Sequence, residues 1–158
     1  MAVKPRALGR IDGNSNYATY DFVVTSGVTV TEGDFVYFDG SGAITNSSVA
    51  GQQLVGMAEE TVTGDGTEKC RVIVDPTMRY LVDNDNVSTT FAATHVGTSF
   101  DLTGATGAQL VDTDTTDANS GQLRCLEYNP QIDPVKDDTS FGIFVIQEHF
   151  LYPEGTGA

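Results

Sequence analysis

Apolar and polar side chains alternate along much of this chain, and short glycine-rich segments repeatedly interrupt the alternation. Residues 29–44, TVTEGDFVYFDGSGAI, alternate β-branched or aromatic side chains with polar ones and then break at residues 39–42. Residues 96–111, VGTSFDLTGATGAQLV, repeat this pattern. Branched and aromatic side chains suit a half-buried sheet, and glycine supplies the positive φ angles of a tight turn. Each stretch therefore predicts a β-hairpin, and hairpins of this kind predict an all-β protein.

Other segments with the same composition predict the remaining strands, at residues 17–25, 53–58, 69–74 and 78–82. Glycines on either side of Asp65 predict a hairpin reversal at residues 63–67. Residues 141–151, FGIFVIQEHFL, are the most apolar stretch and predict a central strand covered on both faces. Residues 86–95 offer a cap and two alanines for one short helix, although their threonines weaken that prediction.

Two acidic stretches, residues 83–86 and 112–121, carry few apolar side chains and are predicted to be surface loops. Their carboxylates are the hard oxygen ligands that calcium prefers, but neither stretch fits the EF-hand spacing. Ser88 and Asp117 stand where glycine is required, and Thr94 and Leu123 stand where an acidic ligand is required. No metal or cofactor site is predicted, and an adventitious surface calcium site stays an open alternative.

The composition divides the chain into a basic start and an acidic remainder. Residues 1–18 hold Lys4, Arg6 and Arg10 but few core-forming side chains, and they predict an extended arm. Residues 19–152 are expected to form a single all-β domain, a compact antiparallel β-barrel or β-sandwich, and residues 153–158 a flexible tail. A chain of 158 residues is long enough to bury its own core without disulfides or metals.

The net charge of −14 argues against nucleic acid as a partner, because phosphate contacts need clustered lysine and arginine. It also disfavours anionic membranes, and no apolar run approaches the roughly 20 residues of a membrane helix. The first residues lack the apolar segment of a secretory signal, so we expect folding in a reducing cytoplasm. Cys70 and Cys125 are expected to be separate buried thiols, with a disulfide formed after release from the cell as the alternative.

Catalytic chemistry has little support in the sequence, and we expect no enzyme. The two histidines, His95 and His149, lie in no recognisable nucleophile motif. His149 is expected to be a partly buried residue with a structural hydrogen bond, and His95 a solvated side chain. The glycine pairs at residues 40–42 and 64–66 lack the remaining residues of a dinucleotide or phosphate loop and are read as turn glycines.

Several motifs, taken in order, resemble the small head proteins that decorate or cement the capsids of tailed bacteriophages. They are GDFVYFDGSGAI at residues 33–44, LVGMA at 54–58, VIVDP at 72–76, VGTSFDL at 96–102 and IFVIQEH at 143–149. The resemblance implies a β-tulip-like domain that stabilises the capsid exterior by bridging neighbouring major capsid subunits, often as a homotrimer. It implies a virion protein assembled in the host cytoplasm and carries over no catalytic residue.

The basic arm and the acidic stretches depart from this resemblance, so the manner of attachment has to come from the residues themselves. We expect residues 1–16 to reach a capsid subunit, with Lys4, Arg6 and Arg10 meeting acidic groups and the backbone extending a capsid sheet. A disordered tail is the alternative for this segment. The alternative for the whole protein is another virion component, such as a host-surface or carbohydrate-binding adhesin, although the chain has no tryptophan for a sugar platform.

Overall fold

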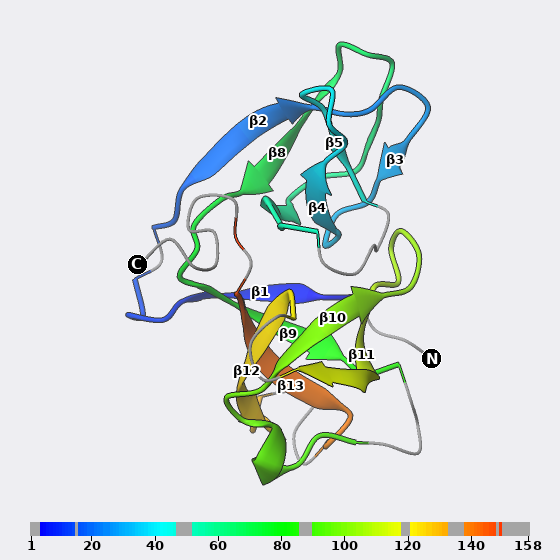
Figure 1. The fold of residues 1–158 in the computed structure, drawn as a ribbon. Coiled ribbons are helices and arrows are strands. Elements are labelled where there is room, and N and C mark those ends of the chain that lie inside the picture. Colours follow the sequence, from blue (N-terminus) through cyan, green and yellow to red (C-terminus); the bar gives the residue numbers. More distant parts are fainter. Residues whose placement is uncertain are drawn as a thin grey trace.

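The computed structural model describes residues 4–14, 16–46, 52–85, 90–117, 121–132, 138–147 and 149. Figure 1 shows the chain as two stacked halves, each built around one antiparallel sheet. The lower sheet has six strands in the order β1 (Arg6–Arg10), β9 (Met78–Asp83), β13 (Phe141–Ile146), β12 (Leu123–Tyr128), β10 (Ser99–Thr103) and β11 (Leu110–Asp117). The upper sheet has the order β2 (Thr19–Val23), β8 (Lys69–Ile73), β6 (Gly56–Ala58), β4 (Phe35–Phe38) and β5 (Ile44–Thr45). Strands β3 (Thr29–Val30) and β7 (Val62–Thr63) form a separate pair.

Both large sheets curl back on themselves. The upper sheet closes between its two outer strands, and the lower sheet closes between β11 and β9, which leaves β1 outside the closure. Val24, which follows β2, forms a parallel bridge with Ile44 of β5. Asn84, which follows β9, forms a parallel bridge with Val111 of β11. Curling removes part of each open sheet edge, which would otherwise expose unpaired backbone groups. The all-β, antiparallel, barrel-like fold predicted from the hairpins is therefore confirmed.

The two hairpins expected from the glycine breaks are present. Strand β4 pairs with β5, and β10 pairs with β11. The reversal predicted at residues 63–67 is present as well. Strands β6 and β8, on either side of it, pair antiparallel, and the short strand β7 between them pairs with β3.

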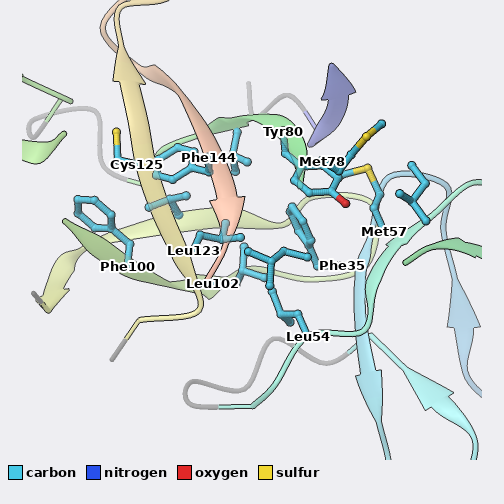
Figure 2. Packing of buried hydrophobic residues seen from close by; sticks show 14 of the residues in the cluster. Phe35, Leu54, Met57, Met78, Tyr80, Phe100, Leu102, Leu123, Cys125 and Phe144 are labelled. Atoms are coloured by element: carbon cyan, nitrogen blue, oxygen red, sulfur yellow. The ribbon is translucent and has the colours of Figure 1, made fainter. Parts of the chain in front are cut away.

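Strands β4 and β6 of the upper sheet are covered on both faces because successive residues enter different clusters. Phe35 of β4 and Met57 of β6 pack into the cluster between the two halves, whereas the next residues, Val36 and Ala58, pack into a cluster inside the upper sheet. Figure 2 shows Phe35, Leu54 and Met57 from the upper half close to Tyr80 and Leu102 of the lower half. The two halves therefore share one apolar core.

Strand β13 has the central position that its apolar sequence predicts. It lies between β9 and β12, and both of its faces are covered. Phe144 and Ile146 pack into the shared core. Phe141 and Ile143 pack on the opposite face with Leu81.

Two buried glutamines join the halves with side-chain amides that bond to strand backbones. The Gln109 Oε1 atom accepts the Phe35 N–H at 2.6 Å, and its Nε2 donates to the carbonyls of Phe35 and Asn46, both at 3.0 Å. Gln122 accepts the Leu102 N–H at 3.0 Å and donates to the Gln52 carbonyl at 2.8 Å. Both side chains are 1% exposed, so their polar atoms depend on these partners.

The close approach of β6 and β8 explains why residue 56 is a glycine. Gly56 of β6 has a φ of +154°, and a Cβ there would lie 1.6 Å from the Ile73 carbonyl oxygen. Any side chain at this position would force β6 away from β8. The antiparallel contact between these strands therefore requires glycine.

Both acidic stretches depart from their predicted loops. Residues 110–117 form β11, so most of the second stretch is a strand; its three last residues before Gly121 lie outside the described residues. Threonine favours strands, and pairing with β10 across a bulge between Phe100 and Asp101 supplies the tertiary partner. In the first stretch, Asp83 belongs to β9, and Asp83 and Asn84 are buried rather than on the surface.

The predicted short helix is reduced to a 3₁₀ turn at Ala93–His95, and residues 86–89 lie outside the described residues. His95 is not simply solvated as expected. Its Nδ1 accepts the Ala92 N–H at 3.0 Å, and its ring makes edge contacts with Phe91 and Phe100. These aromatic contacts hold the turn against the core.

Candidate functional site

The basic arm predicted at residues 1–18 is partly built into the lower sheet. Arg6–Arg10 form β1, which pairs with β9 and shifts register between Ala7 and Gly9. Ala7 packs against the shared core and Leu8 against the opposite cluster. The arm is therefore not free along its whole length. Residues 1–3 and 15 lie outside the described residues.

Arg10, one of the three expected capsid-binding cations, is engaged within the protein. Its guanidinium lies 3.2 Å from both the Asp75 and the Asp12 carboxylates. It also donates to the Thr77 hydroxyl at 3.2 Å and to the Asn16 carbonyl at 3.4 Å. These contacts tie the end of β1 to the β8–β9 turn.

The surroundings of the Asp75 carboxylate lower its pKa. Burial acts to raise its pKa, but hydrogen bonds from Thr77 and the charge of Arg10 outweigh that effect, so the pKa lies below its usual range. A low pKa keeps Asp75 charged at neutral pH. Arg10 therefore has a permanent partner inside the molecule and contributes to structure first.

Lys4 and Arg6 differ from Arg10 because they stand exposed. The Lys4 amino group lies 3.8 Å from Glu32, with side chains 47% and 62% exposed, and a surface pair of this kind contributes about 0–1 kcal/mol. Among the described residues Arg6 is exposed and has no ion pair. The structure thus separates the three cations into one structural residue and two that can meet a partner.

A fourth cation, Arg79 of β9, lies beside them and was missed by the sequence interpretation. It is the register partner of Gly9, and its Nε donates to the Gly9 carbonyl at 3.4 Å. Arg79 sits in an apolar run that predicts a strand, and no local signal connects it with residues 6–10. Only the pairing of β1 with β9 brings it to the site.

The backbone of β1 offers a second feature. In the described sheet β1 is an outermost strand and pairs through one edge only, with β9. An outermost strand carries backbone N–H and C=O groups that another extended chain can pair with. A sheet edge and two exposed cations therefore coincide on residues 4–7 of a chain whose net charge is −14.

The residues considered for catalysis do not form a reactive site. His149 is 1% exposed, and burial lowers its pKa to about 4. Cys70 and Cys125 are separate, buried and free, as expected, and burial raises the pKa of each thiol to about 11. A thiol with so high a pKa is a poor nucleophile at neutral pH. The described residues include no group of three or more potential metal ligands.

No protein family model matches the sequence, and no curated protein matches it. The described part of the structure contains no helix long and apolar enough to cross a membrane.

Proposed function

We propose that this protein is a viral structural protein that decorates a bacteriophage capsid and stabilises it by bridging neighbouring major capsid subunits, without catalysis. The observation that carries the proposal is the coincidence of an outermost strand, β1, with the exposed cations Lys4 and Arg6 on a strongly acidic protein. The resemblance of the sequence motifs to phage head decoration proteins gives the partner its identity.

A capsid cement has to fold alone and add to a preformed lattice through contacts only. The curled sheets, with their shared core and buried glutamine links, suit a rigid body of that kind. Lys4 and Arg6 would meet acidic groups of the major capsid protein, and the backbone of β1 would extend a capsid sheet. Arg10 would act indirectly by holding β1 in place. The resemblance adds assembly as a homotrimer on the capsid exterior.

The test is to mix the purified protein with expanded, undecorated capsids of the parent phage, pellet them and image the pellet by electron microscopy. We expect regular added density at lattice positions and greater resistance of the capsid to heat. A folded protein that does not co-sediment would overturn the proposal. Binding to glycans or host cells instead would favour the adhesin alternative.

A further inference from the structure

A cavity of about 410 Å³ lies where β1 approaches the upper sheet. Its walls are largely apolar and come from Pro5, Ala7, Met57, Ala58, Ile73 and Leu81. The volume falls within the usual range for ligand pockets in proteins, which is about 300–1,000 Å³. An apolar cavity of this size next to an outermost strand is a candidate binding site.

The rim of the cavity is polar, and four of its polar side chains form two pairs with each other. On the rim, Lys4 pairs with Glu32 at 3.8 Å, and the Tyr17 hydroxyl donates to Glu59 at 2.8 Å. That hydrogen bond raises the pKa of Tyr17, so the hydroxyl stays a donor. Both acids have partners, whereas the rim residue Arg6 has no ion pair among the described residues. Arg6 can therefore pair with an anionic group next to whatever enters the cavity, while the charged residues of the lining as a whole are two cations and two acids.

Residues 4–5 lie over one side of the cavity. A Cβ at Gly33, which has a φ of +91°, would lie 2.9 Å from the Pro5 carbonyl oxygen, so the chain packs directly on this glycine. Lys4 and Glu32 reinforce the same contact. Residues 4–5 thus form a wall of the cavity and lead into β1.

We propose that this cavity receives a large apolar side chain from an extended, acidic segment of the major capsid protein. The inference rests on the proposed function and adds to it the place where the partner is anchored. The edge of β1 that has no partner strand among the described residues favours a peptide over a small molecule, because a peptide backbone can bond to the strand while one side chain fills the cavity. Arg6 and Lys4 then face the acidic residues that flank the apolar one.

Arg6 gives an acidic capsid segment a charge partner beside the cavity, because it is exposed and has no ion pair among the described residues. Burial of one large apolar side chain contributes to the affinity of such a contact. Filling the cavity should therefore cost at least tenfold in affinity, and a factor of ten corresponds to about 1.4 kcal/mol.

The test fills the cavity from inside the protein. Ala7→Leu places extra carbons in the cavity, and Ala92→Leu makes the same change at an exposed position away from it. Co-sedimentation with undecorated capsids should show at least tenfold weaker binding for Ala7→Leu and unchanged binding for Ala92→Leu. Equal binding of all three proteins would overturn the anchor site and leave the decoration function standing. A wild-type protein that does not bind would overturn both.

A second measurement on the wild type keeps the test decisive if Ala7→Leu does not fold. Amide hydrogen exchange is compared between the free and the capsid-bound protein. Residues 4–7 and 57–59 should exchange more slowly in the bound state, because the inserted segment covers both walls of the cavity. Unchanged exchange at these residues in a bound protein would overturn the anchor site.

Discussion

The Asp34 carboxylate and the Thr106 hydroxyl lie 2.6 Å apart, although 72 residues separate them in the sequence. Asp34 is fully buried, and its oxygens also accept the N–H groups of Thr31 and Gly107 and the side-chain amide of Asn46. A buried carboxylate needs such donors to replace its lost hydration. Asp34 therefore joins the turn before β4 to the β10–β11 turn and fixes the two halves together.

Thr106→Val is expected to lower the free energy of unfolding by about 1–3 kcal/mol, because it removes one donor from a buried carboxylate and keeps the shape of the side chain. Thr106→Ser keeps the hydroxyl and should have little effect. Urea denaturation of both variants measures the difference. Equal stability of the two variants would show that the hydroxyl contributes nothing to the contact.

Gln109→Leu should destabilise the protein by about 2–4 kcal/mol, because it leaves the N–H and carbonyl of Phe35 and the carbonyl of Asn46 without their partner. Gln53→Leu, at an exposed position, is the matched control. Denaturation midpoints at equal denaturant slopes give the comparison. A small loss for Gln109→Leu would mean that water replaces the amide.

His149 predicts a pH dependence of stability. Its pKa is about 4 in the folded protein and about 6.5 in an unfolded chain, so the unfolded state binds the extra proton in this window. The free energy of unfolding should therefore fall by roughly 2–3 kcal/mol as pH drops from 6.5 towards 4.5. Urea titrations of the wild type and His149→Gln check this. The variant should lose most of the slope above pH 5, and equal slopes would exclude His149 as the cause.

Cys70 and Cys125 should resist thiol reagents in the native state. Each is buried, and each thiol has a pKa of about 11, so little thiolate forms at pH 8. Ellman's reagent should release almost no colour from the folded protein and two equivalents per chain in guanidinium chloride. Rapid labelling of the folded protein would show that one of the strands opens readily.

Arg6 and Arg10 should respond to substitution in different assays. Arg6→Glu is expected to weaken capsid binding about tenfold without changing stability, because the residue is exposed and makes no ion pair among the described residues. Arg10→Ala should instead lower the free energy of unfolding by about 1 kcal/mol through its lost contact with Asp75. Co-sedimentation and urea denaturation separate the two effects. Unchanged binding by Arg6→Glu would remove the arm from the capsid contact.

Some of the candidate site was predictable, and some was not. The cluster of Lys4, Arg6 and Arg10 is visible in the sequence because the three residues lie close together in it. Arg79 joins them only through the pairing of β1 with β9. Arg10 forms an ion pair with Asp75, which lies 65 residues later in the sequence, and so is not available to a partner protein. Contacts between distant segments leave no local pattern, so composition could not assign the separate roles of these cations.

The sequence by itself determined several of the segments that become strands, because alternation of side chains and turn glycines act within a few residues. It determined the hairpins β4–β5 and β10–β11 and the buried central strand β13 for the same reason. Only the tertiary structure decided that residues 6–10 join the lower sheet and that the threonine-rich residues 110–117 form a strand. Those outcomes depend on a partner strand far away in the chain, whose hydrogen bonds and packing outweigh weak local preferences.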